Sequence, residues 1–195
     1  MTGSAYELTD KAFDTQRAFR GVLEALSRPG KIVSVGKQDK KPDVLQSATV
    51  AVALCLFDHD TEIWMGEGIA EIEVFDFLKF NCGCPVTTSG MVADFAIACA
   101  NNSLPDVSQF KQGSDDFPDR STTLVVQAPD LETGPVVTLT GPGIKHESVL
   151  TIAGISDYFW QKRREQNAVF PRGVDILFTS GDRVVALPRS TRLGD

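Results

Sequence analysis

The sequence predicts an α/β fold of three layers, in which one mixed β-sheet has helices on both faces. Segments of helical periodicity alternate with short β-rich runs along the 195 residues. A hairpin pattern closes the chain, because Val174–Thr179 and Arg183–Leu187 flank Gly181, which permits the positive φ of a hairpin turn. Length and composition suit one globular domain over residues 1–195, with 42% hydrophobic and 23% charged residues.

The first predicted element is a helix that Thr9 or Asp10 caps. Apolar side chains recur there at helical spacing, and polar side chains take the other face. The helix ends at Ser27, because Pro29 excludes a helical Arg28 and Gly30 accepts the positive φ of a type II turn. The recurring apolar residues are Phe13, Phe19, Val22, Leu23 and Leu26, and a strand over Lys31–Val35 follows the turn.

The middle of the chain alternates apolar runs with turns. Ser47–Phe57 is long and rich in alanine, so it predicts a buried helix, although periodicity alone leaves a strand open. A short strand over Glu62–Met65, a surface helix around Leu78 and a strand over Met91–Cys99 are expected next. The polar stretch that follows predicts loops, with one helical turn near Val107–Phe110.

The last third predicts two short β-rich runs, Leu124–Gln127 and Val136–Leu139, before the break at Gly141-Pro142-Gly143. A helix capped by Ser156 or Asp157 then extends to about Gln166. Its basic residues 162–164 lie near the carboxyl end, where they suit the helix dipole. The turn at residues 170–173 leads into the closing hairpin.

Charge and hydropathy exclude several classes of protein. The net charge is −7, and the acidic groups lie mainly in residues 1–159, which carry 22 acidic and 12 basic side chains. This balance argues against nucleic-acid binding. The sequence contains no run of 18 apolar residues, so no membrane span is predicted. The amino terminus lacks the features of a secretory signal, so a cytoplasmic protein is expected. Residues 160–195 carry 7 basic and 4 acidic groups, which indicates either a solvated surface or contact with a phosphate-bearing ligand or acidic partner.

No catalytic residue, metal site or cofactor site is assigned from motifs. Cys82-Gly83-Cys84-Pro85 is a single pair of cysteines, whereas a structural zinc site needs four ligands and thioredoxin-like sites need two intervening residues. His59 and His146 lie in loop segments without a supporting nucleophile motif. The glycines around Pro142 match neither a dinucleotide-binding loop nor a phosphate-binding loop, and predict a simple turn.

Arginines near the carboxyl terminus are the main candidates for a binding site. Arg172 precedes the hairpin and Arg189 follows it, so the antiparallel return brings them close together. Two or three guanidinium groups there, with Arg183 and Arg192 in the same group, suit a phosphate or carboxylate. The alternative is an interface or a surface cluster of ion pairs. Arg28 is a further ligand-binding or interface candidate, although turn geometry alone explains its position.

Three stretches resemble the PhnH subunit family of the bacterial carbon–phosphorus lyase system. The first is Leu26-Ser27-Arg28-Pro29-Gly30-Lys31-Ile32-Val33, and the second is Leu139-Thr140-Gly141-Pro142-Gly143-Ile144. The third contains Phe170-Pro171-Arg172-Gly173-Val174-Asp175-Ile176-Leu177-Phe178, Gly181-Asp182-Arg183 and Ala186-Leu187-Pro188-Arg189-Ser190-Thr191. They span most of the chain in the family's order, and the chain length also agrees.

The resemblance implies a fold similar to the large domain of pyridoxal-phosphate-dependent transferases, but smaller and without the cofactor site. It also implies a homodimer that joins PhnG, PhnI and PhnJ subunits in a core complex for phosphonate use. With PhnI, PhnG and PhnL components, PhnH-like subunits support displacement of adenine from ATP by methylphosphonate, which yields alpha-D-ribose 1-methylphosphonate 5-triphosphate. The later radical cleavage of the C–P bond belongs to the iron–sulfur subunit.

Three functional hypotheses therefore stay open. The first is a scaffolding or co-catalytic subunit of this complex, which suits a chain without a recognisable nucleophile or base. The second is a stand-alone enzyme, such as a vestigial pyridoxal-phosphate protein, for which Lys79 and Lys145 are Schiff-base candidates by position only. The third is a regulator that binds phosphonates or nucleotides through the carboxyl-terminal arginines.

Overall fold

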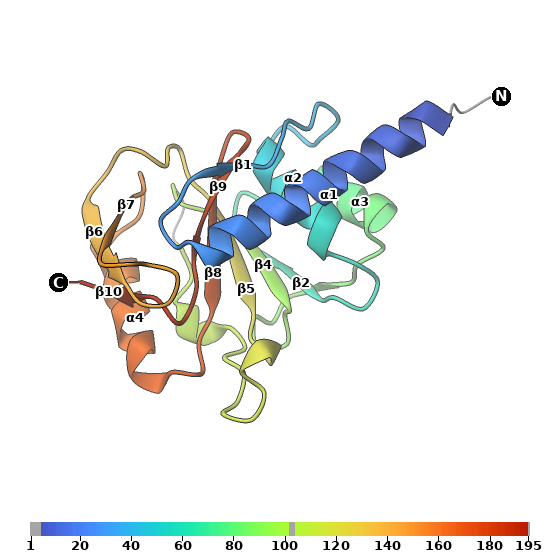
Figure 1. Ribbon diagram of the computed structural model, residues 1–195. Helices are drawn as coiled ribbons and strands as arrows, with labels where there is room; N and C mark the ends of the chain where they lie inside the picture. Colours follow the sequence, from blue (N-terminus) through green and yellow to red (C-terminus); the bar gives the residue numbers. More distant parts are fainter. Residues whose placement is uncertain (1–4, 102–103, 195) are drawn as a thin grey trace.

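The computed structural model describes residues 5–101 and 104–194, which form a seven-stranded mixed sheet and a separate three-stranded sheet (Figure 1). The strand order of the large sheet is β1-β9-β8-β5-β4-β2-β3. Neighbours from β8 to β3 are parallel, whereas β9 is antiparallel to both β8 and β1. The bounds are β1 Val33–Ser34, β2 Ile63–Met65, β3 Val86–Thr87, β4 Phe95–Cys99, β5 Thr123–Gln127, β8 Asp175–Ser180 and β9 Arg183–Leu187.

Three helices cover one face of the large sheet. Side chains alternate across each strand, so Ile97, Val125 and Leu177, which lie side by side in register, share this face. Val125 and Leu177 pack in one cluster with the first two helices, and Ile97 packs in a cluster that includes the third. The helices are α1 Ala5–Ser27, α2 Ser47–Leu56 and α3 Ile72–Asn81.

The opposite face is covered jointly by a helix and the small antiparallel sheet, whose order is β10-β6-β7. Leu124 and Phe178 point to this face and pack in one cluster with Leu139, Leu150 and Trp160. The elements are β6 Val136–Thr140, β7 Ser148–Thr151, α4 Asp157–Gln166 and β10 Arg192–Leu193. The expected mixed sheet between two covering layers is therefore present, but the second layer is only partly helical.

The first helix differs from the sequence expectation in its start and in its buried face. It begins at Ala5, so the predicted caps Thr9 and Asp10 lie inside it. Phe13, Phe19 and Leu23 are 65%, 42% and 49% exposed, whereas the buried face is formed by Ala18, Val22 and Ala25.

Close approach explains this choice of face. A Cβ atom on Gly21 would lie 2.9 Å from Val35 Cγ1, so α1 sits almost directly on the chain that follows β1. Small residues fill so narrow a contact better than phenylalanine does. Periodicity showed that apolar side chains recur along this helix. It did not show that the buried side of the helix has too little space for the large ones.

Several strand boundaries and pairings were also predicted wrongly. The strand expected over Lys31–Val35 contains only β1, and the strand expected over Met91–Cys99 begins at Phe95. The run at Val136–Leu139 does not join the large sheet. Strands β3, β7 and β10 were not predicted: β3 and β10 have only two residues each, and β10 pairs with the distant β6. Two 3-10 turns, η2 Pro118–Arg120 and η3 Asn167–Val169, were likewise missed.

Other local predictions are confirmed. Ser47–Leu56 is a buried helix, and the helical turn near Val107 is η1 Val107–Gln109. Gly30 has a φ of 84° and Gly181 has a φ of 59°, as the two turns require. Among the described residues, no helix is long and apolar enough to cross a bilayer.

Replacing Ser156 with alanine is expected to lower the free energy of unfolding by about 1 kcal/mol. The Ser156 hydroxyl accepts a hydrogen bond from the Phe159 N–H at 3.3 Å and so caps α4 as predicted. Alanine leaves that N–H without its partner. Urea unfolding monitored by circular dichroism measures the change. Ser156→Asn is the control because asparagine also caps helices, and equal losses in both variants would contradict a capping role.

Candidate functional site

The candidate site is a cavity of about 270 Å³, here called the α4 groove. It lies between α4, η1 and the turn that precedes β8. The lining residues are Asp106, Val107, Ser108, Gln112, Lys162, Glu165, Gln166, Val169 and Arg172. Two cationic and two anionic side chains therefore surround a lining that also contains two valines.

Two side-chain contacts align η1 with α4. At one end, the Tyr158 hydroxyl donates to Asp106 Oδ2 at 3.1 Å, and at the other, Gln166 Nε2 donates to Gln112 Oε1 at 2.8 Å. The eight-residue separation of Tyr158 and Gln166 corresponds to about 12 Å along a helix. The groove is therefore elongated along α4.

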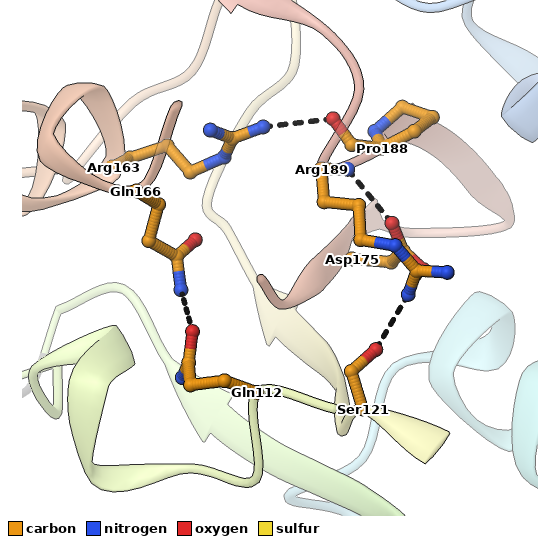
Figure 2. A network of polar contacts seen from close by, with 7 residues as sticks. All are labelled: Gln112, Ser121, Arg163, Gln166, Asp175, Pro188 and Arg189. Carbon is orange, nitrogen blue, oxygen red and sulfur yellow. Dashed lines mark hydrogen bonds and ion pairs between the residues drawn. The ribbon is translucent and has the colours of Figure 1, made fainter. Parts of the chain in front are cut away.

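The Gln112–Gln166 pair forms a rigid wall of the groove (Figure 2). Gln112 Nε2 donates to the carbonyl oxygens of Val107 and Phe110 at 2.7 and 2.8 Å, so its Oε1 must face Gln166. That contact fixes the Gln166 amide in turn and directs its oxygen away from Gln112, as the figure shows. Gln166 is only 8% exposed, so both amides are held in place by the fold.

Charges at the Asp106 end are stabilised by their neighbours. Burial opposes ionisation of Asp106, but hydrogen bonds from Ser108 and Tyr158, together with the charge of Lys162, lower its pKa overall. A hydrogen bond from Lys162 lowers the pKa of Glu165, and the same contact raises the pKa of Lys162. All three groups are therefore charged at neutral pH, which leaves one negative charge in excess.

Arg189 does not line the groove and belongs to a second polar network (Figure 2). Its Nη1 donates to Ser121 Oγ at 2.6 Å and to Asp175 Oδ2 at 3.0 Å, while its backbone N–H donates to Asp175 Oδ1 at 2.7 Å. The Arg189 side chain is 19% exposed. These contacts tie the end of β9 to the starts of β5 and β8, which is a structural role.

Arg163 is the largest fully buried side chain and was not anticipated as one. The sequence placed it at the helix end as a partner of the dipole, but it is 0% exposed. Its Nη2 donates to the carbonyl oxygens of Pro188 and Thr191 at 2.7 and 3.1 Å. Burial lowers its pKa to about 10, although the charge of Asp175 opposes this shift. Arg163 is therefore a buried cation that holds the carboxyl-terminal segment.

The structure brings Arg172 and Arg189 into the same region, as expected. A Cβ atom on Gly173 would lie 3.2 Å from Arg189 Cβ, so Arg189 packs on the residue next to Arg172. Only Arg172 lines the groove, and its Nε lies 3.3 Å from Asp115 Oδ1.

The other candidate arginines lie elsewhere. Arg183 is at the opposite end of the β8–β9 hairpin, with Nη1 2.6 Å from Glu132 Oε2. Arg28 directly follows α1, with Nη1 3.8 Å from Glu24 Oε1. Arg192 is exposed on β10. The four candidates Arg28, Arg172, Arg183 and Arg189 thus form no single cluster, and each has a carboxylate partner. Their assignment to ligand or interface contacts stays a prediction.

The cysteine pair lies between α3 and β3, which is an outer strand of the large sheet. The groove instead adjoins the turn before β8. Cys84 is 4% exposed, and Cys82 Sγ lies 3.8 Å from the Ala53 carbonyl oxygen. Hydrogen bonding between the two thiols raises the pKa of Cys82 and lowers that of Cys84. Within the described ranges, no three histidine, cysteine or acidic residues gather to hold a metal ion.

The groove itself was missed at the sequence level. Gln112 and Gln166 belong to no motif. A glutamine in a polar loop or on a helix predicts only a surface residue. The only available signal was Gln166 on the same helix face as Phe159 and Arg163, at spacings of seven and three. That pattern indicates a buried face but not its partner.

Comparison with known proteins gives the family. A family model described as "Bacterial phosphonate metabolism protein (PhnH)" matches residues 6–194. A protein of Rhizobium meliloti (strain 1021), named alpha-D-ribose 1-methylphosphonate 5-triphosphate synthase subunit PhnH, is 36% identical over 94% of this chain and 92% of its own. The putative C-P lyase subunit protein HtxG of Stutzerimonas stutzeri is 31% identical over 91% of this chain and 85% of its own. The resemblance seen in the sequence is thereby confirmed, and the chain belongs to the PhnH family of bacterial phosphonate metabolism proteins.

Proposed function

We propose that this chain is a subunit of the carbon–phosphorus lyase core complex and supports formation of alpha-D-ribose 1-methylphosphonate 5-triphosphate from ATP and methylphosphonate. The main support is a relative that is named as a subunit of alpha-D-ribose 1-methylphosphonate 5-triphosphate synthase. This chain is 36% identical to it over nearly the whole of both chains. The second relative is named as a C-P lyase subunit, which agrees with a subunit role in phosphonate catabolism.

The proposed contribution is scaffolding or co-catalytic. The largely buried ion pair between Arg189 and Asp175 supports this role, because it fixes elements of the chain itself rather than leaving the arginine for a ligand. Exposed large apolar side chains support it as well, since permanent assemblies bury such residues between subunits. The proposed setting is the cytoplasm, and the whole chain is proposed to act as one domain.

Coexpression with PhnG-, PhnI- and PhnJ-type subunits tests the role directly. A tag on this chain is expected to retain all three through affinity purification, and native mass measurement gives their stoichiometry. Synthase activity is then compared between preparations made with and without this chain. Recovery of the tagged chain alone, together with full activity in its absence, would contradict the proposal.

We propose α1 as the homodimer contact. Phe13, Phe19 and Leu23 are exposed on this 23-residue helix, and a helix that pairs with its own copy gives the self-complementary surface of a two-fold dimer. Phe13→Asp combined with Leu23→Asp is expected to convert a dimer into a monomer in analytical ultracentrifugation. Phe80→Asp on α3, where the side chain is 89% exposed, is the matched control. A dimer that survives the α1 changes but not the control would place the contact on α3.

The fold is proposed to correspond to the large domain of pyridoxal-phosphate-dependent transferases. Support comes from the mixed seven-stranded sheet, in which only β9 runs against the other strands, and from its two covering layers. Superposition on solved transferases is the test. Equivalent strands in the same order and direction are expected, whereas a different strand order would reject the correspondence.

A further inference from the structure

The two ends of the α4 groove offer opposite charge. At the end near Tyr158, the acids Asp106 and Glu165 face one cation, Lys162. At the other end, Arg172 is the lining cation, and its partner Asp115 is 78% exposed. Water screens an ion pair this exposed, so Arg172 exchanges Asp115 for another anion at little cost. The groove therefore has an acidic end and an end with an exchangeable cation.

Part of the groove lining is apolar, and part of it is rigid. Val107 and Val169 contribute the aliphatic surface. Gln112 and Gln166 lock each other through a 2.8 Å hydrogen bond, and Gln112 is held further by the Val107 carbonyl oxygen. A wall that is ordered before a ligand arrives loses little entropy on binding. This arrangement suits a short alkyl chain that carries a charge at each end.

We propose that the α4 groove binds a small zwitterion, with its ammonium group at Asp106 and Glu165 and its compact oxyanion at Arg172. The volume of about 270 Å³ lies just below the range of roughly 300–1,000 Å³ that is usual for small-molecule pockets, so it suits a ligand smaller than a nucleoside triphosphate. Within the proposed function, on which this choice rests, the oxyanion is a phosphonate and the ligand an aminoalkylphosphonate. An amino acid with a terminal amine shares the same chemistry.

Isothermal titration calorimetry with the full-length chain tests the proposal. Aminoethylphosphonate and aminopropylphosphonate are the zwitterionic phosphonates, and beta-alanine is the carboxylate counterpart. Ethylphosphonate and ethylamine each carry one of the two charges. At least one zwitterionic phosphonate is expected to bind at least about tenfold more tightly than either singly charged compound, because it engages both ends of the groove.

Two substitutions locate the ligand. Arg172→Met removes the cation but keeps an aliphatic stem, and Asp106→Asn removes one negative charge but keeps an oxygen that caps η1. Each is expected to weaken zwitterion binding by about tenfold or more. Arg17→Met is the matched control, because Arg17 is also an exposed arginine paired with an aspartate but lies on α1. Melting curves confirm that all three variants fold.

The outcomes separate this inference from the proposed function. Equal binding of ethylphosphonate and the zwitterions, absence of binding by any zwitterion, or full affinity in both groove variants would overturn the inference. Tight binding of beta-alanine alone would keep a zwitterion site but remove the link to phosphonates. Retention of PhnG-, PhnI- and PhnJ-type partners is measured on the same preparations, and that result tests the subunit role independently.

Discussion

Replacement of Gly143 with alanine is expected to lower the free energy of unfolding by about 3 kcal/mol or more. Gly143 has a φ of +82°, and an added Cβ would overlap the carbonyl oxygen of Ser27 and lie 3.0 Å from Pro29 Cδ. The first obstacle is backbone, so no side-chain rotation relieves it. The loop at residue 143 must then separate from the end of α1.

Urea unfolding of Gly143→Ala and Gly181→Ala measures this effect against a matched control. Gly181 also has a positive φ, +59°, but nothing lies within 4 Å of its added Cβ. Its substitution therefore carries only the backbone strain, about 1–2 kcal/mol. The difference between the two variants isolates the steric clash. Equal losses would show that the contact between Gly143 and Ser27 does not limit stability.

The second large effect is expected at Arg163. Arg163→Ala should lower the free energy of unfolding by about 3–5 kcal/mol, because it leaves a cavity and removes the buried hydrogen bond to the Thr191 carbonyl oxygen and the part-buried one to that of Pro188. Arg163→Met should cost less, since methionine fills the space and removes a buried charge. The folded pKa of about 10 lies below the ordinary 12.5, so the charged form opposes folding at every pH below about 10.

Thermal and urea unfolding of the two Arg163 variants near neutral pH test this expectation. Hydrogen exchange adds a local reading, because the segment from Pro188 to Thr191 is held by Arg163 and should lose protection first in Arg163→Ala. Arg164→Ala is the neighbouring control, since its Nε donates to the Gly194 carbonyl oxygen from a less buried position. If Arg163→Met were as unstable as Arg163→Ala, the charge itself would be required.

Local sequence chemistry predicted the elements whose signals lie within a few residues. The α4 cap at Ser156, the hairpin at Gly181 and the buried helix Ser47–Leu56 were all found this way. The two turns that carried the family resemblance illustrate the limit. Each was explained by its own φ angles, but the structure shows that Gly143 packs on Ser27 and Pro29.

Long-range contacts account for what the sequence did not predict. The small sheet pairs β10 with β6 across more than 50 residues, and no local pattern encodes that pairing. The α4 groove depends likewise on Gln112 meeting Gln166, which are 54 residues apart. Arg172 was named as a site candidate because hairpin geometry placed it near Arg189, whereas Asp106 at the acidic end of the groove comes from a loop that appeared only polar.

The short outer strands of the large sheet decide how this chain can meet its neighbours. Strands β1 and β3 have two residues each, so the sheet offers almost no backbone rim onto which another polypeptide can add a strand. Association at the large sheet must then occur through side chains on helices and loops. Contacts of that kind change with single substitutions, so recognition between subunits can diverge among relatives while the sheet is preserved.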